Sequence, residues 1–402
     1  MRTVYTTEAS ERWTISEQTG RNPGELAYGV ETCPWMEGNS NPSTDQLLEM
    51  VVDPENMKTA WKQVKRNKGA AGVDRRSIDD TKVYLREHWP RICQSLLNET
   101  YRPYPVLRVE IPKPGGGVRK LGIPTVIDRL VQQAICQIMA PIFDPTFSEF
   151  SYGFRPGRSA HDAIHQAQAF QEEGKRWAVD LDLKQFFDEV DHDILMSRLG
   201  RKIKDKRLKR LINAFLKAGV QCAEGILPTD KGAPQGGPLS PLLSNILLDD
   251  LDKELERRGL SFCRYADDCN IYVGSRRAGE RVMDSITRFI EGRLKLIVNQ
   301  EKSAVGLPTE RCFLGLSFYR QRGRVHIAVH EKSLKTFRTH LKELFRIGRG
   351  RNLERFITED LNPAVRGWFQ YFSIGLSYRM TKTLDFGIRR KLRCLIWRQW
   401  KG

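Results

Sequence analysis

Short runs in which apolar and polar residues alternate predict the strands of this chain. Residues 107–111 show this period of two, which is typical of a half-buried strand, and residues 177–183 form a second run. Residues 262–273 hold two runs rich in aromatic and β-branched side chains around the adjacent carboxylates Asp267 and Asp268. We expect this last segment to form a strand, a tight turn and a returning strand, with the carboxylates at its tip.

Apolar residues that recur every three or four positions predict the helices. Asp53 is a suitable N-cap and Pro54 a suitable first residue for a helix that Gly69 can end. The other segments with this period are 128–140 with Asp128 as the expected N-cap, the second half of 154–169, 242–251, 280–294 and 334–345. Residues 232–238 hold three glycines and two prolines, which excludes a regular helix or central strand there.

The charge balance changes this picture of an ordinary globular chain. Of 402 residues, 66 are Lys or Arg and 49 are Asp or Glu, a net charge of +17 and a pI near 9.6. Such a surplus favours a polyanionic partner such as nucleic acid. No apolar run approaches the roughly 18 residues of a membrane span, and the N-terminus lacks the apolar core of a signal peptide, so we expect a cytoplasmic protein. The eight cysteines form no Cys-x-x-Cys pair, so neither a disulfide framework nor a zinc site is indicated.

The carboxylates are the candidate chemistry. Two neighbouring anions at a turn repel each other and persist where solvent or bound cations neutralise them, which favours either a solvated turn or a divalent metal site. Further aspartates lie within and shortly after the predicted strand at 177–183. Within that strand, Asp180 and Asp182 share one face. Residue chemistry alone does not choose among the aspartates at 180, 182, 188, 191 and 193.

Six motifs occur in a fixed order. They are Ile111-Pro112-Lys113, the run from Phe154 to His161, Asp182-Leu183-Lys184-Gln185-Phe186-Phe187-Asp188, the run from Pro234 to Pro241, Tyr265-Ala266-Asp267-Asp268, and Phe313-Leu314-Gly315-Leu316. In their residues and in their order, these motifs resemble those of the reverse transcriptases encoded within group II introns. The resemblance covers roughly residues 47–402. The chain stops at Gly402 without an endonuclease module, and so is most similar to the class C branch of that family.

This resemblance implies an α+β fold of the right-hand polymerase type. Fingers and palm, with an antiparallel palm sheet packed by helices, are expected over 106–330, after an N-terminal extension at 47–105. An α-helical thumb or maturase domain is expected over 331–402, where 17 basic and 6 acidic residues give a net charge of +11. Residues 1–46 carry a net charge of −4 without periodicity and are expected to be a mobile tail.

The resemblance also implies roles for individual residues. It selects Asp182 from the acidic group and places it with Asp267 and Asp268 as catalytic ligands of two Mg²⁺ ions, roughly 3.5 to 4 Å apart. The expected nucleotide contacts are Lys113, Arg119, Gln235 and Lys302, with Phe187 excluding a 2′-hydroxyl and Phe186 in the core. Lys113 and Arg119 flank a glycine-rich loop, and this arrangement suits the binding of a triphosphate. A solvated turn without a ligand could have the same sequence pattern. The expected nucleic-acid contacts are Arg155, Arg158, Lys332, Lys335, Arg338 and Lys342.

The function that follows is RNA-directed DNA synthesis, a nucleotidyl transfer. The partners would be an RNA template, a DNA primer, deoxynucleoside triphosphates and the intron RNA, which the protein would bind as a maturase to assist splicing and mobility in a cytoplasmic ribonucleoprotein. Two alternatives are a host-adopted reverse transcriptase for DNA repair or phage defence, and an RNA-binding splicing cofactor without polymerase activity. The intact acidic triad argues against the second alternative.

Overall fold

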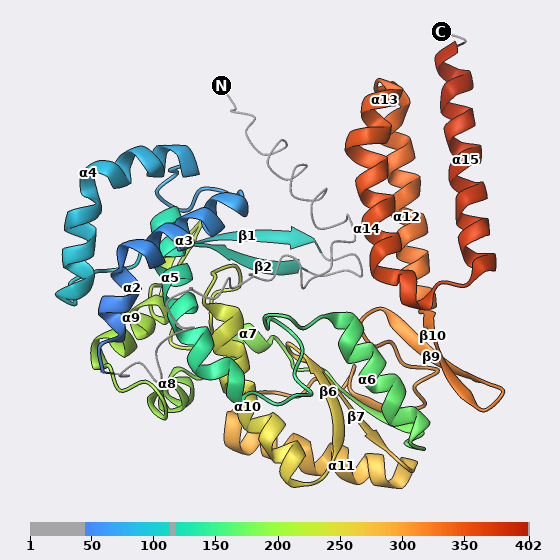
Figure 1. The fold of residues 1–402 in the computed structure, drawn as a ribbon, viewed down its shortest axis with the longest axis horizontal. Helices are drawn as coiled ribbons and strands as arrows, with labels where there is room; N and C mark the ends of the chain where they lie inside the picture. The colour runs from blue at the N-terminus through green and yellow to red at the C-terminus, as the bar shows by residue number, and fades with distance from the viewer. Residues whose placement is uncertain (1–44, 113–117, 401–402) are drawn as a thin grey trace.

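The computed structural model of the protein describes residues 45–112 and 118–400. Residues 1–44 of the expected tail and Lys113 lie outside this range. The N-terminal helices and a small sheet lie on one side of the molecule, a larger sheet lies at its base, and a group of long helices stands on the other side (Figure 1).

The N-terminal helices are α2 (Leu47–Val52), α3 (Pro54–Arg66) and α4 (Ile78–Leu97). The Asp53 carboxylate accepts bonds from the amides of Glu55 and Asn56, at 2.9 and 3.3 Å, so the predicted cap of α3 is confirmed. The Asn56 side chain then bonds the Ala134 carbonyl of α5 (Val126–Phe143) at 3.2 Å. These helices therefore share a hydrophobic core with α5 and with the central part of the chain.

The expected N-cap of α5 was wrong. The cap is Thr125, whose hydroxyl accepts a bond from the Asp128 amide, and Asp128 lies in the first turn. The Asp128 carboxylate is instead buried, where it accepts hydrogen bonds from the hydroxyls of Thr125 and Tyr101, both at 2.7 Å. Burial raises the pKa of Asp128 to about 6.

The smaller sheet has the order β2-β1-β4-β5. Its strands are β1 (Val106–Pro112), β2 (Val118–Ile123), β4 (Val220–Cys222) and β5 (Gly225–Leu227). β1 and β2 pair in antiparallel register, which confirms the predicted strand and the return of the chain after it. Helices α7 (Phe186–Glu189), α8 (His192–Gly200) and α9 (Lys206–Leu216) connect this region to the larger sheet.

The larger sheet has the order β6-β7-β3-β8, with every pair antiparallel. Its strands are β3 (Trp177–Leu181), β6 (Ser261–Tyr265), β7 (Asp268–Val273) and β8 (Ala304–Gly306). The predicted hairpin is thus confirmed as β6-turn-β7. The predicted strand over 177–183 is two residues too long, because the Asp182 amide leaves the ladder to bond the Ser303 hydroxyl at 2.9 Å.

Alternate residues of this sheet enter two cores. Phe262, Ile271 and Leu181 pack in the core shared with α10 (Ser240–Arg257) and α11 (Arg276–Phe289). Cys263, Tyr272 and Ala178 face α6 (Ala160–Glu172) on the opposite side. Helix α11 begins four residues before the predicted start, because Ser275 caps it, and a π-helical turn (Ile290–Leu294) continues it to the predicted end.

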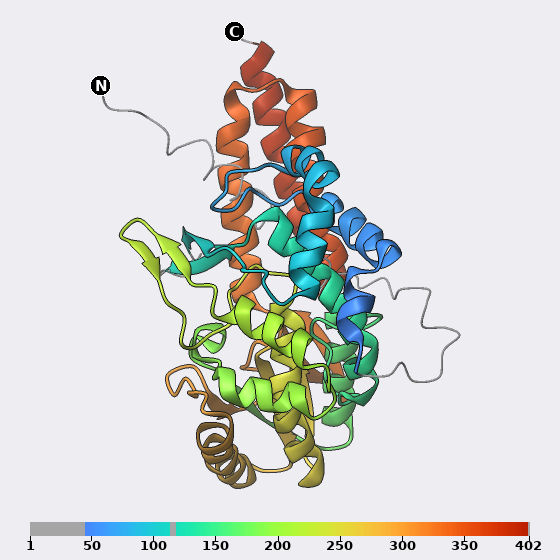
Figure 2. The same ribbon diagram turned by 90° about the vertical axis from the view of Figure 1, so that its left-hand side faces the viewer.

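The C-terminal region follows the hairpin β9 (Leu316–Gln321) and β10 (Arg324–Val329). Helices α12 (Glu331–Ile347), α14 (Asn362–Phe372) and α15 (Tyr378–Trp400) stand together above it, with short α13 (Leu353–Arg355) and a π-helical turn (Phe356–Leu361) between the first two (Figures 1 and 2). Phe337 of α12 stacks on Trp368 of α14 with ring centroids 4.1 Å apart. The apolar stripe predicted for residues 334–345 therefore lies in the interior of this bundle. Among the described helices, none has the length and apolar character needed to span a bilayer.

Candidate active site

One cavity of about 630 Å³ brings together most of the predicted site residues. It lies where the ends of β3, the β6-β7 turn, β2 and the start of α12 meet. The predicted residues that line it are Asp182, Asp267, Asp268, Arg119, Phe187, Gln235, Lys302 and Lys332. Segments more than 200 residues apart in sequence therefore contribute to one site.

Asp182 is held by the segment that follows α11. The Asp182 amide donates to the Ser303 hydroxyl, and its carbonyl accepts from the Asn299 amide at 2.8 Å. Lys302 in the same segment forms an ion pair with the Asp182 carboxylate, Nζ to Oδ2 3.2 Å, while 66% of the Lys302 side chain stays exposed. The lysine thus lies at the mouth of the cavity with its charge beside the first acid.

The turn between β6 and β7 presents the other two acids. Tyr265 pairs with Asp268 across the hairpin, so only Ala266 and Asp267 form the loop. Ala266 has a φ of +57°, a left-handed conformation that non-glycine residues adopt infrequently. This sharp turn directs Asp267 and Asp268 into the cavity that Asp182 enters from β3.

Burial and mutual repulsion perturb these carboxyls. Burial is the main cause that raises the pKa of Asp268 well above its usual value, followed by the charges of Asp180, Asp267 and Asp182. Burial also raises the pKa of Asp267, with a further contribution from Asp182, while Arg119 and Arg264 oppose the rise. Four acids that destabilise each other's charged forms make a site that a cation would stabilise.

The donor set fits Mg²⁺. The ion prefers oxygen ligands, keeps several waters and is usually bound by one or two carboxylates together with substrate phosphates. Within residues 45–112 and 118–400, no three acidic, histidine or cysteine side chains stand close enough to form a complete metal cage. A site completed by water and a nucleotide's phosphates requires no such cage, so the carboxylates present fit the ion.

β2 and the 232–238 loop form another part of the cavity wall. Arg119 is exposed on β2, and the Gln235 carbonyl accepts a bond from the Gly122 amide of the same strand at 2.7 Å. Gly236 has a φ of +119°, and a Cβ there would lie 2.4 Å from the Gly122 carbonyl oxygen, so only glycine lets the loop approach the strand. The loop also reaches α7, where the Ala233 amide bonds the Phe187 carbonyl at 2.7 Å.

Phe186 and Phe187 have different environments. Phe186 is 2% exposed, which confirms its predicted place in the core, whereas Phe187 is half-buried; both residues line the cavity. Their rings meet edge to face with centroids 5.1 Å apart. Phe186 thus packs against the more exposed ring of Phe187.

The structure gives Arg155 a different role from the one expected. Its side chain is 4% exposed, and all five N–H donors bond protein oxygens, namely the Asp144 carboxylate and the carbonyls of Asp144, Ser148 and Ser151. No donor remains for a template phosphate, so we correct this assignment to a structural one. Arg158 is half-buried outside the cavity and donates to the Glu149 carbonyl.

The basic residues of α12 are distributed along its exposed side. Lys332 lines the cavity, whereas Lys335, Arg338 and Lys342 are exposed beyond it. Among the C-terminal aromatic residues, Trp368 and Phe372 are buried and Phe369 and Tyr371 are half-buried, while Tyr378, Phe386, Trp397 and Trp400 of α15 are 67% to 86% exposed. Only Leu384 and Leu395 are buried in the described length of α15, so its aromatic side chains take little part in the core of the bundle.

Several cavity residues were not predicted as functional. Lys120, Lys184, Asn299 and Cys312 line the cavity, and so does Asp180, which sequence reasoning had left among the alternatives. Asp180 lies opposite Asn270 of β7. The spacing of two between Asp180 and Asp182 was the only sequence signal for this placement.

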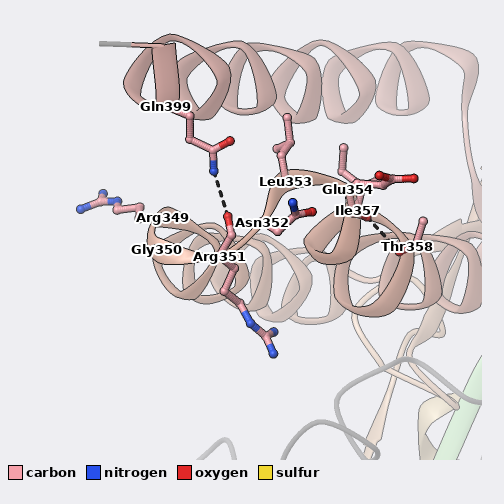
Figure 3. Close-up of a pocket in the computed structure, with 9 residues that line it drawn as sticks. All are labelled: Arg349, Gly350, Arg351, Asn352, Leu353, Glu354, Ile357, Thr358 and Gln399. Atoms are coloured by element: carbon pink, nitrogen blue, oxygen red, sulfur yellow. Dashed lines mark hydrogen bonds between the residues drawn. The ribbon is translucent and has the colours of Figure 1, made fainter. Parts of the chain in front are cut away.

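A larger cavity, of about 780 Å³, lies at the far end of the C-terminal bundle. Residues 349–354 line it together with Ile357, Thr358 and Gln399, and the Gln399 side chain donates to the Arg351 carbonyl at 2.8 Å (Figure 3). Its single acidic lining residue, Glu354, offers no group of carboxylates. The cavity of about 630 Å³ that holds the three acids is therefore the candidate active site.

Comparison with known proteins agrees with this geometry. The family described as reverse transcriptase (RNA-dependent DNA polymerase) matches residues 111–318, more than half of the chain. The chain belongs to the reverse transcriptase family. The maturase-specific domain of group II intron proteins matches residues 334–402, so this reverse transcriptase carries the domain pair of group II intron-encoded proteins. The expected family, right-hand polymerase fold and RNA-directed DNA polymerase class are confirmed.

The alignments of this chain with individual similar proteins cover different shares of those proteins. Protein YkfC of Escherichia coli (strain K12) is 33% identical over 331 residues, which cover 72% of this chain and 87% of YkfC. Group II intron-encoded protein LtrA of Lactococcus lactis subsp. cremoris is 37% identical over 276 residues, 66% of this chain and 44% of LtrA. Among solved structures, telomerase from Candida albicans aligns over 76% of this chain and 61% of that chain, with 16% identity and a TM-score of 0.45. The reverse transcriptase family depends in general on divalent metal, and both matched domains imply nucleic-acid binding.

Proposed function

We propose that this reverse transcriptase binds two Mg²⁺ ions through Asp182, Asp267 and Asp268 and adds deoxynucleotides to a primer paired with RNA. The observation that carries the proposal is the convergence of these three acids with Arg119, Gln235 and Lys302 in one cavity. When bound, the ions lower the pKa of the primer 3′-hydroxyl and neutralise charge on the triphosphate.

The side chains around the acids position the nucleotide. Arg119 and Lys302 both line the cavity, where they would bind the triphosphate, and Lys302 forms an ion pair with Asp182. Phe187 would lie under the sugar and collide with a 2′-hydroxyl. Gln235, with both donors and an acceptor on its side chain, would contact the nucleotide or the templating base. Lys113 belongs to the same proposal but lies outside the described residues.

The C-terminal bundle would bind nucleic acid by charge. Lys335, Arg338 and Lys342 are exposed on α12 beyond the cavity, and Arg158 lies two residues before the start of α6. The exposed aromatic residues of α15 lie among arginines and lysines, an arrangement that suits stacking on unpaired bases. We propose intron RNA as the ligand of this surface, which gives the protein its maturase activity.

Two assays separate the two activities. The wild-type protein should extend a DNA primer on an RNA template with Mg²⁺ and deoxynucleotides. Asp267→Asn with Asp268→Asn removes two anionic ligands at nearly constant volume, so it should abolish extension. The surface of the bundle beyond the cavity should still bind intron RNA and support splicing at low Mg²⁺. Asp284→Asn, an exposed change on α11, serves as the control and should leave both activities intact.

Three outcomes would contradict parts of this proposal. Absence of extension by folded, RNA-free wild-type protein removes the polymerase assignment. A well-folded double variant that binds the intron but cannot support splicing would show that both activities use the acidic site. If the wild type supports splicing of no associated intron, a host-adopted polymerase becomes the better interpretation.

A further inference from the structure

A buried arginine lies directly beneath the turn that presents the two acids. Arg264 precedes the turn on β6, and neither its side chain nor that of its ion-pair partner Asp252 on α10 has any exposed surface. Two of its N–H groups meet the Asp252 carboxylate at 2.7 and 2.6 Å. This pair satisfies the charge but uses only two of the five donors.

The other three donors join the turn to its surroundings. One Nη1 bond reaches the Ala266 carbonyl at 2.8 Å, and the second reaches the Asn245 side chain of α10 at 3.0 Å. Nη2 also donates to the Ser151 hydroxyl at 2.7 Å. The guanidinium therefore links the first residue of the turn to α10 and to the segment that precedes α6.

That preceding segment encloses the turn from the other side. Backbone bonds join Arg264 to Phe150 and Tyr152, at 2.9 and 2.8 Å, and Asn245 donates to the Gly153 carbonyl at 2.9 Å. A Cβ on Gly153 would lie 2.2 Å from the Ala266 amide nitrogen. The backbone of the turn thus lies against a neighbouring backbone with no room for a side chain between them.

We propose that Arg264 is a positioning residue for catalysis. Its guanidinium holds the Ala266 carbonyl in the left-handed turn and thereby fixes where Asp267 and Asp268 enter the cavity. Asp252 is its counterion, and Asn245 and Ser151 orient its plane. The inference rests on the proposed role of Asp267 and Asp268 as metal ligands, although the mechanical link to the turn can be measured without that role.

Lysine is the informative substitution. Arg264→Lys keeps the positive charge beside Asp252, but an ammonium with three donors on a flexible stem cannot reproduce five bonds in one plane. Displacement of a catalytic group by about 1 Å can cost roughly 10²-fold in rate. We therefore expect kcat for nucleotide addition to fall by about tenfold to 10²-fold, with KM for the nucleotide and the affinity for RNA within about twofold.

A second measurement does not depend on activity. In metal-free protein, the backbone amides of residues 265–269 should exchange with solvent about tenfold faster in the lysine variant, because the turn loses its anchor. Arg198→Lys is the matched control. Arg198 pairs with Asp250, two residues before Asp252 on α10, and 17% of each of these side chains is exposed, but neither lines the cavity. This control should leave kcat and the exchange of residues 265–269 unchanged.

The results decide the inference in each case. Arg264→Lys with wild-type kcat and wild-type exchange would overturn it, and so would an equal loss of kcat in both lysine variants. Should Arg264→Lys fail to fold, Ser151→Ala keeps the ion pair and removes one bond to the guanidinium. Asn245→Ala also keeps the ion pair, but it removes both its bond to the guanidinium and its bond to the Gly153 carbonyl. At least one of them must then lower kcat and speed exchange at 265–269, and wild-type behaviour of both would refute the role. A wild-type protein that extends no primer removes the proposed function instead, while the exchange result still decides whether Arg264 anchors the turn.

Discussion

Substitution of Asp180 by asparagine should stabilise the metal-free protein at neutral pH. Asp180 lies on β3 beside the proposed ligands, and burial is the main cause that raises its pKa to about 6, with a further contribution from Asp182 and an opposing one from Arg311. Asparagine keeps nearly the same volume but carries no charge. The wild-type protein therefore maintains at pH 7.5 a carboxylate that the folded site disfavours.

The size of the effect follows from the pKa difference. The folded-state pKa of about 6 lies about two units above that of an unfolded aspartate, and each unit corresponds to about 1.36 kcal/mol, so ionisation costs about 3 kcal/mol. Because the folded pKa is the higher one, stability falls as pH rises between about 4 and 6. The cost is absent below about pH 4 and complete above about pH 6.

Thermal and urea unfolding in EDTA at pH 4 and pH 7.5 measure this difference. Asp180→Asn should raise the free energy of unfolding at pH 7.5 by up to about 3 kcal/mol and leave it nearly unchanged at pH 4. Added Mg²⁺ should narrow the difference, since cations neutralise the same group of acids. Asp284→Asn on the exposed side of α11 should change stability by less than about 0.5 kcal/mol at either pH.

Two results would refute this reasoning. A gain in stability that persists at pH 4 would show that the benefit does not arise from charge, and no gain at pH 7.5 would show that Asp180 is not destabilised by its surroundings. Because the proposed ligands are Asp182, Asp267 and Asp268, the variant should still extend a primer. Loss of extension as complete as in the double asparagine variant would place Asp180 among the metal ligands.

Two further predictions concern the substrate and the RNA. Phe187→Ala should increase ribonucleotide incorporation more than it impairs deoxynucleotide use, as measured by single-nucleotide extension, and unchanged discrimination would assign sugar selection to another residue. RNA affinity should fall by roughly three decades between about 50 and 200 mM salt if about six phosphates are contacted. Charge reversal of Lys335, Arg338 and Lys342 should flatten that dependence, and an unaltered salt slope would mean that these residues do not contact phosphate.

The sequence alone determined the local elements and the motif order. The two runs rich in aromatic and β-branched residues within 262–273 predict a hairpin, and the two acids between the runs then lie at its tip. Asp53 caps its helix as predicted because a cap needs only residues two or three positions away. The six ordered motifs identified the family, which requires no knowledge of contacts.

Only the tertiary structure decided which polar groups are available for function. In the sequence, Arg155 has the character of a surface cation, but in the structure it bonds carbonyls within residues 144–151. Asp128 was expected to cap its helix, but Thr125 is the cap and the Asp128 carboxylate accepts a hydrogen bond from Tyr101, 27 residues away. Asp182 is held by Ser303, 121 residues away, and Arg264 by Ser151, 113 residues away. A sequence pattern records the backbone's local preference, whereas burial and hydrogen-bond partners depend on which distant segments pack together, and that packing decides the catalytic geometry.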